Sequence, residues 1–199
     1  MTMDPFAGKE PKDAKDVFSA INARQIRALM FHSEMADMMG FLGLDGFQAM
    51  HDYQFLSESA EHRKTKNYFL ARHKRYLPDE EVDAFDIIPD DWVNYTKADV
   101  TPAIRRQYLQ KGMEHYYNWE SETKELYCAA AHYLLDWGMV SDFNRVNDLV
   151  KDVCCELGCV TKLHLDLKAV DYDPAYVMEL QKCYCKKYKG KPAVIEAHK

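Results

Sequence analysis

The sequence Gly43-Leu44-Asp45-Gly46 is a short turn signal between two long stretches rich in helix-forming residues. Asp45 is placed to cap the following helix, because a carboxylate at this position accepts hydrogen bonds from unpartnered backbone N–H groups. The stretch before the turn predicts a helix over 14–42. The stretch after it predicts a helix over 47–76, which ends just before Pro78. A turn this short makes the two helices antiparallel neighbours.

The second half of the chain repeats this arrangement. Thr101 and Pro102 form a helix start, since proline is favoured in the first turn and a threonine hydroxyl can cap it. They predict a helix over 102–137. After a short connection, further helices are predicted over 142–168 and, more briefly, over 174–189.

Between the two helix pairs lies a long acidic segment, residues 78–100. It contains several Asp and Glu residues and the apolar residues Phe85, Ile88 and Trp92, which we expect to anchor it to the outside of the bundle. Two antiparallel hairpins joined by a long crossover define an all-α four-helix bundle, here with a short fifth helix at the end.

Bulk composition supports one globular domain over residues 14–189, with a flexible leader at 1–13 and a flexible tail at 190–199. The 199-residue chain carries a net charge of -6, which argues against nucleic acid as the main partner. The most apolar run, residues 35–42, is too short to span a membrane. Because the amino terminus has no hydrophobic signal core, a cytoplasmic location is expected, with the six cysteines as free thiols.

Ionisable residues in the apolar stripes of the helices are the candidates for function, because a buried charge must be paired or must bind a metal. On the third helix the apolar stripe passes through Trp119 and Leu126 at helical spacing, with His115 and Glu122 on the same face. Glu122 is therefore expected to be buried near the bundle axis.

The other three long helices also carry carboxylates near their expected inner faces. Met30, Phe31, Met38 and Phe41 flank Glu34 on the first helix. The remaining candidates are Glu58, Glu61 and His62 on the second helix and Asp152 and Glu156 on the fourth.

Each candidate has a structural alternative. Glu34 and Glu122 could pair with Lys or Arg, His62 could be a surface residue, and Asp152 and Glu156 could form a solvated flank. Cys183 and Cys185 supply two thiols, whereas a structural zinc site requires four ligands. The basic residues of the last helix are interpreted as a solvated helix end.

The segments Gly43-Leu44-Asp45-Gly46-Phe47 and Leu56-Ser57-Glu58-Ser59-Ala60-Glu61-His62 resemble the ferritin family, and Asn22-Ala23-Arg24-Gln25-Ile26 resembles the start of a ferritin first helix. The resemblance implies a ferritin-like bundle with a di-iron centre that oxidises ferrous iron, often inside a hollow shell. It assigns Glu58, Glu61 and His62 as ligands from the second helix, Glu122 from the third, and Asp152 and Glu156 from the fourth.

The sequence departs from the full di-iron pattern, in which a Glu is followed three residues later by His. Ser59 stands three residues before His62, and no Glu-x-x-His pair occurs in the chain. A ferritin-like alignment also places Ala28, rather than Glu34, at the first-helix ligand position.

Three hypotheses follow, and they leave enzymatic activity open. The first is an iron-handling oxidoreductase that binds iron or a related divalent metal. The second is a non-catalytic ferritin-like scaffold that acts by associating with itself or with a partner. The third, a nucleic-acid-associated mini-ferritin, is disfavoured by the acidic charge.

A homo-oligomer is expected on separate grounds. The helices carry more aromatic and Met residues than one core stripe requires, and apolar surface of that size marks an interface. The residues assigned to this surface are Phe31, Met35, Met39, Tyr53, Phe55 and Tyr117.

Overall fold

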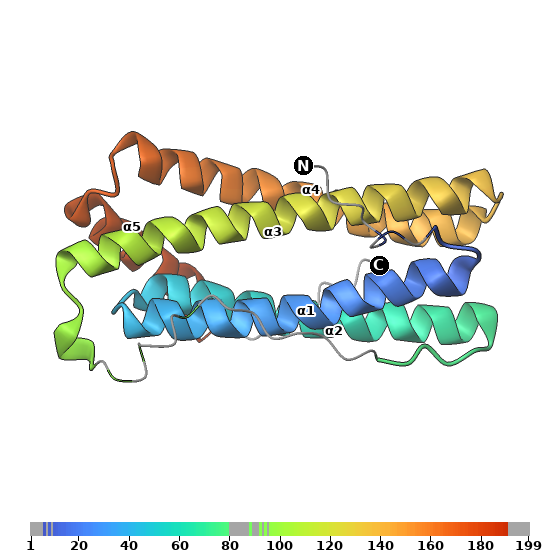
Figure 1. Ribbon diagram of the computed structural model, residues 1–199, viewed down its shortest axis with the longest axis horizontal. Helices are drawn as coiled ribbons and strands as arrows, with labels where there is room; N and C mark the ends of the chain where they lie inside the picture. Colours follow the sequence, from blue (N-terminus) through green and yellow to red (C-terminus); the bar gives the residue numbers. More distant parts are fainter. Residues whose placement is uncertain are drawn as a thin grey trace. The chain divides into compact units, whose positions relative to one another are not determined.

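The computed structural model describes Phe6, Gly8, residues 10–79, Ile88, Trp92, Asn94 and residues 96–190. Within these residues there are five α-helices and no strand. The helices are α1 (Ala14–Phe41), α2 (Asp45–His73), α3 (Pro102–Asp136), α4 (Val140–Ala169) and α5 (Pro174–Tyr188), with a short 3-10 turn at Lys97–Asp99 before α3 (Figure 1). The predicted all-α class and the five predicted helices are confirmed.

Local backbone chemistry explains where the predicted ends shift. Gly43 adopts φ 72°, and the Leu44 N–H donates to Met39 O at 2.8 Å, so the chain reverses at once and α2 begins at Asp45. Helix α2 ends at His73, three residues before the predicted end, because Lys74 has φ 56°, a left-handed conformation that no α-helix continues. At the start of α5, the Asp173 carboxylate accepts from the Tyr176 N–H, as a helix cap does.

The chain forms two compact units, and the long helices contribute to both. Unit 1 comprises Met1–Arg24, Thr65–Glu81 and Met113–Leu165, and unit 2 comprises Gln25–Lys64, Val82–Gly112 and Asp166–Lys199.

Unit 1 contains the antiparallel pairings expected of the two hairpins. Phe18, early in α1, lies 5.3 Å from the ring of Phe69, late in α2. Tyr117 of α3 stacks on His164 of α4, with ring centroids 6.0 Å apart. The hydrophobic core of unit 1 includes Val17, Leu134 and Val146, all three fully buried.

Buried methionines form part of the core of unit 2. Gly112 of α3 allows a close approach of α1, because a Cβ at this position would lie 2.6 Å from the terminal methyl of Met38 and 3.0 Å from that of Met39. The assignment of Phe31, Met35 and Met39 to an oligomer interface is therefore wrong, because all three are buried in the core of this chain. Phe55 and Tyr117 are exposed, and Tyr53 is half-buried.

The residues predicted to anchor the crossover differ in how far they are buried. Trp92 is buried, as expected, and its ring packs 4.8 Å from Phe41 and 4.4 Å from Tyr108. Ile88 is half-buried. Phe85 and the tail at 191–199 lie outside the described residues. None of the helices in the described ranges is long and apolar enough to cross a membrane.

Candidate metal centre

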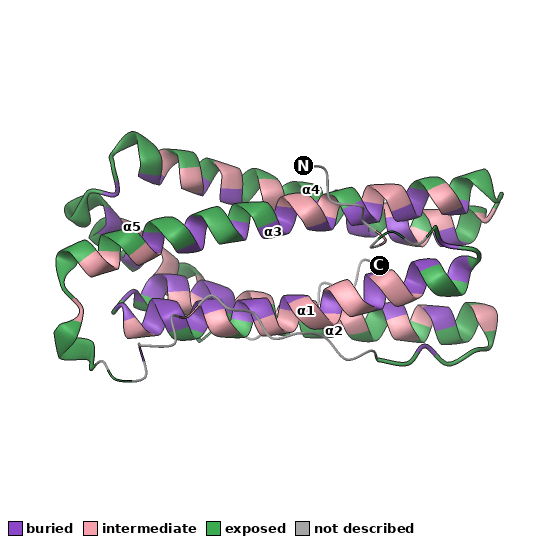
Figure 2. Cartoon of the chain, in the orientation of Figure 1, coloured by how far each residue is buried: buried purple, intermediate pink, exposed green. Residues whose placement is uncertain are grey.

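Each long helix has an inner stripe, which we define as a series of buried and half-buried residues spaced three or four apart. Figure 2 shows such buried positions recurring along α3. On α3 the inner stripe is Leu109, Met113, Tyr116, Glu120, Thr123, Tyr127, Ala130 and Leu134. It contains one carboxylate, Glu120, whose residue is only 3% exposed.

The predicted α3 stripe was therefore out of phase by a fraction of a turn. His115, which it placed inside, is exposed. Glu122, expected to be buried near the bundle axis, has a side chain that is 38% exposed. Because Trp119 and Leu126 are themselves buried, they fit both phases, and their apolar character alone could not distinguish Glu122 from Glu120.

Glu122 contacts a cation. Its Oε2 atom lies 3.5 Å from Nη1 of Arg24, whose side chain is only 11% exposed. The Arg24 guanidinium stacks 3.3 Å from the centre of the Trp119 ring. It also donates to Thr123 Oγ1 at 2.8 Å and to Trp119 O at 2.7 Å. Arg24 thus contacts an aromatic ring face, two neutral acceptors and a carboxylate. The pairing of Glu122 with an arginine is the structural alternative to metal binding that the sequence allowed.

The candidate acidic residues of α2 lie on the inner face of the helix, as expected. The inner stripe of this helix is Phe47, His51, Gln54, Glu58, Glu61, Thr65 and Phe69. Glu58 and Glu61 lie on it and His62 lies beside it, all three half-buried. Glu61 also pairs with Lys64 at 3.3 Å, one turn further along the helix.

Of the remaining candidate ligands, one lies on an inner stripe and two do not. On α4 the stripe passes through Val153, Glu156 and Val160, so half-buried Glu156 lies on it whereas exposed Asp152 does not. On α1 the stripe is Ala14, Phe18, Ile21, Gln25, Ala28, His32, Met35 and Met39. Glu34 is half-buried but lies off this stripe, which contains no carboxylate.

The donor set does not assemble into a metal centre within the described parts of the chain. No three His, Cys, Asp or Glu side chains there are arranged so that they could hold a metal ion. Unit 2 contains Glu34, Glu58, Glu61 and His62, and unit 1 contains Glu122, Asp152 and Glu156. The ligand assignments therefore stay predictions.

The structure contains a buried histidine pair that was not predicted from the sequence. His32 of α1 and His51 of α2 are both buried, and their Nδ1 atoms lie 3.0 Å apart. Burial lowers the pKa of His32 to about 3, and burial together with the charge of His32 holds the pKa of His51 well below its usual value. Both rings are therefore neutral near pH 7, with one Nδ1–H donating to the other Nδ1. Their positions on the two inner stripes were the signal that could have identified them.

A second missed cluster surrounds the fully buried Asp142 in the first turn of α4. Its Oδ1 atom accepts from His73 Nε2 at 2.9 Å and from the Tyr68 hydroxyl at 3.1 Å. Burial and the Asp142 carboxylate raise the pKa of Tyr68 to about 12. Arg72 Nε lies 3.9 Å from the other carboxylate oxygen. The cluster links the last turn of α2 to the first turn of α4, where an anion also interacts favourably with the helix dipole.

Comparisons with solved structures identify the fold. The chain matches a humanized archaeal ferritin with a TM-score of 0.71 and 16% identity, over 88% of this chain and 97% of that one. It matches an Archaeoglobus fulgidus ferritin engineered into a closed form with a TM-score of 0.70 and 16% identity, over 88% and 96% of the two chains. An open-pore ferritin from the same hyperthermophilic archaeon gives a TM-score of 0.72 at 14% identity, over 87% and 95%.

The class is thus a ferritin-like four-helix bundle with a short C-terminal helix, as the sequence predicted. No protein-family model matches the sequence. A search of curated proteins also finds no match.

Proposed function

We propose that this chain is a ferritin-like scaffold that works without a di-iron centre and acts by associating with copies of itself. The observation that carries the proposal is the contact of Arg24 with Glu122, Trp119 and Thr123. Arginine stays protonated at any physiological pH, so its charge is permanent. A metal ion bound to Glu122 would have to displace this cation or lie beside it.

The pattern of the inner stripes supports the same proposal. Carboxylate-bridged di-metal centres of bundles draw a Glu from each of two helices and a Glu-x-x-His pair from each of the other two. The α1 stripe carries Gln25 and His32 but no carboxylate. The α2 stripe has Glu61 three residues after Glu58, where that pattern requires histidine.

Self-association is supported by apolar side chains at the turn between α3 and α4 in unit 1. Leu135, Trp137 and Val140 are 48%, 38% and 58% exposed, within six consecutive residues. Neighbouring apolar residues that remain in water at a helical turn are a suitable surface for a second copy of the chain. A homo-oligomer formed through this surface is the assembly we propose.

The variant Leu135→Lys/Val140→Lys should weaken this association, because burying two lysines in an apolar contact without partners is unfavourable. Sedimentation velocity at tens of micromolar should show an oligomer for the natural chain and mainly monomer for the variant. Leu165→Lys is the matched control, since Leu165 is equally exposed on α4 but about 37 Å along the helix from Val140. A natural chain that sediments only as a monomer would contradict the proposal.

The second candidate function is binding of iron or a related divalent metal, with oxidation or storage of iron as its outcome. Its support is the half-buried position of Glu58, Glu61 and His62 within two turns of α2, together with the fold. Glu156 and the buried Glu120 are further carboxylates on inner stripes. Glu34, Glu122 and Asp152 complete the predicted ligand set.

We also infer that the protein works in a reducing compartment such as the cytoplasm. All six cysteines are free thiols, and Cys154, Cys155, Cys159 and Cys183 are exposed. Exposed thiols at this density persist unpaired where cellular reductants are present.

A further inference from the structure

Unit 2 contains a cavity of about 140 Å³ where the end of α1 and the crossover meet the start of α3. Its wall includes three aromatic residues, two aliphatic residues and one acid: Phe41, Trp92, Tyr108, Val100, Ile104 and Asp99. The cavity is smaller than pockets for drug-sized ligands, which are roughly 300–1,000 Å³, so it suits one compact chemical group. Neither the predicted metal ligands nor the residues of the proposed association surface line it.

The three aromatic rings of the wall pack against one another. The Trp92 ring lies 4.8 Å from the Phe41 ring at an interplanar angle of 32°, and 4.4 Å from the Tyr108 ring at 70°. Tyr108 is thus nearly perpendicular to Trp92, so the cluster presents ring surface in more than one direction. Trp92 is buried and fixes the positions of its neighbours, whereas Phe41 and Tyr108 are half-buried and remain accessible to a ligand.

Aromatic surface of this kind favours cations, because the quadrupole of the ring makes its face negative. Tyr108 already shows this preference within the chain, since Lys111 Nζ lies 5.1 Å from the centre of its ring. Lys111 itself does not line the cavity. A cation in the cavity would meet the same type of surface on Tyr108 and, in addition, on Phe41.

Asp99 gives the wall a negative charge. Its Oδ2 atom accepts from the Thr96 N–H at 2.7 Å and from the Thr96 hydroxyl at 2.8 Å, which fixes the carboxylate in the turn before α3. These hydrogen bonds hold the pKa of Asp99 below its usual value, so the carboxylate is ionised at neutral pH. Among the described residues that line the cavity, Asp99 alone has a charged side chain.

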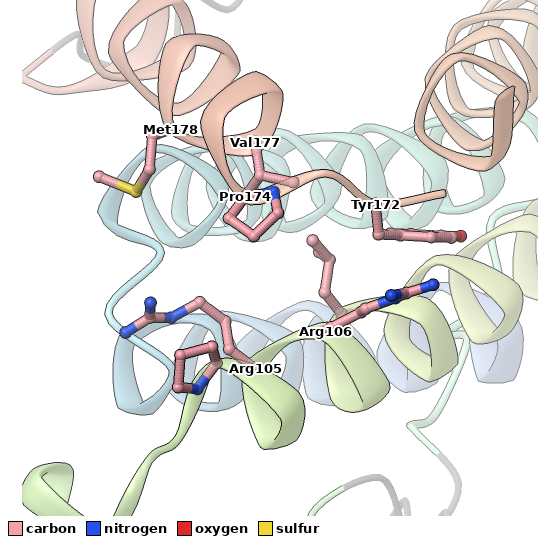
Figure 3. Close-up of a pocket in the computed structure, with 8 residues that line it drawn as sticks. Arg105, Arg106, Tyr172, Pro174, Val177 and Met178 are labelled. Atoms are coloured by element: carbon pink, nitrogen blue, oxygen red, sulfur yellow. The ribbon is translucent and has the colours of Figure 1, made fainter. Parts of the chain in front are cut away.

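The arginines at the start of α3 line a different cavity. Figure 3 shows Arg105 and Arg106 projecting from α3 beside this second cavity, which has a volume of about 40 Å³ and reaches the start of α5. Arg105 Nε donates to Leu42 O at 2.7 Å, and Arg106 pairs with Asp171. The first turns of α3 thus place two cations at the second cavity and none in the wall of the aromatic one.

We propose that the aromatic cavity binds a quaternary ammonium group, such as the trimethylammonium group of choline. Methyl groups spread the positive charge over a compact apolar surface, which matches an aromatic wall. Phe41 and Tyr108 contact the methyl groups, and the Asp99 carboxylate balances the charge. This binding is independent of whether the bundle holds a metal.

Choline is the probe for the test, and binding is followed by NMR through the indole N–H signal of Trp92 and the backbone amide signals of Val100 and Ile104. The natural chain should show saturable shifts at millimolar choline. The neutral analogue 3,3-dimethyl-1-butanol, in which carbon replaces the charged nitrogen, should bind about fivefold more weakly or worse. Absence of saturable shifts, or equal affinity for the neutral analogue, would overturn the proposal.

Two substitutions separate the aromatic contribution from the electrostatic one. Tyr108→Leu keeps an apolar side chain but removes the ring, and should weaken choline binding about three- to thirtyfold. Asp99→Asn keeps an oxygen for Thr96 but removes the charge, and should weaken binding about two- to fivefold. Tyr176→Leu, at an exposed position of α5 outside the cavity, is the matched control and should change the affinity less than about twofold. Unchanged affinity in either folded cavity variant also overturns the proposal.

A trimethylammonium group can belong to a free solute or to the headgroup of a lipid, and vesicles of phosphatidylcholine distinguish these two sources. Co-sedimentation of the natural chain with the vesicles, lost in Tyr108→Leu, would identify the headgroup as the source. Saturable binding of choline without co-sedimentation would identify a free solute. Either result supports recognition of the trimethylammonium group.

Discussion

Replacing Asp142 with alanine is expected to lower the free energy of unfolding by about 3–5 kcal/mol, one of the largest effects of any single substitution in this chain. Asp142 is fully buried and accepts from His73 and Tyr68. Its removal leaves these donors without their acceptor and removes the negative charge near Arg72. Urea unfolding followed by circular dichroism measures the change.

Asp148→Ala is the matched control on the same helix. Asp148 pairs with Lys151 at 2.8 Å, but both side chains are largely exposed. An exposed pair of this kind contributes about 0–1 kcal/mol, so the control should unfold almost as the natural chain does. Equal effects of the two substitutions would show that Asp142 does not stabilise the ends of α2 and α4.

Lowering the pH from 7 to 5 is expected to produce the second large loss of stability, because His32 and His51 must remain neutral in the folded chain. Their pKa values are lowered by burial from 6.5, to about 3 for His32. The unfolded chain therefore binds protons that the folded chain does not, and stability falls as pH drops below about 6.5. At about 1.4 kcal/mol per pH unit, each histidine should contribute roughly 2 kcal/mol of destabilisation at pH 5.

The His32→Leu/His51→Leu variant isolates this contribution. Replacing both partners with apolar groups of similar size is nearly neutral at pH 7, because no donor is left without an acceptor. Between pH 7 and pH 5 the double variant should lose about 4 kcal/mol less than the natural chain. His132→Leu, at an exposed position of α3, should leave the pH dependence unchanged. If the double variant shows the natural pH dependence, the buried pair does not remain neutral.

Helix boundaries were predictable from sequence because local chemistry sets them. The Gly43 turn, the Pro102 start of α3 and the Asp173–Pro174 start of α5 each depend on a few neighbouring residues. The main error, at the end of α2, came from Lys74, a residue type that gives no warning of a positive φ. The positions of the helices along the sequence could thus be predicted without any knowledge of tertiary packing.

The residues that face inward were harder to predict, because the phase of a helix depends on what packs against it. On α3 the run Tyr116, Tyr117 and Trp119 is apolar on more than one side, so the sequence allowed two stripes. Packing selects the one that contains Glu120 and leaves Glu122 at the boundary with Arg24. Similarly, His32 and His51 are polar and were not predicted to be buried. Their burial is explained by the hydrogen bond between the two rings, which only the structure shows.

The absence of a di-iron centre is the central claim, and the metal content of the protein purified without chelator tests it most directly. We expect far less than one iron per chain after incubation with ferrous iron, and no change in Glu122→Gln, which should only lose the charge on the partner of Arg24. Two irons per chain, as a two-metal site requires, with a sharp decrease in Glu58→Gln or Glu122→Gln, would contradict the scaffold and establish the metal-binding function.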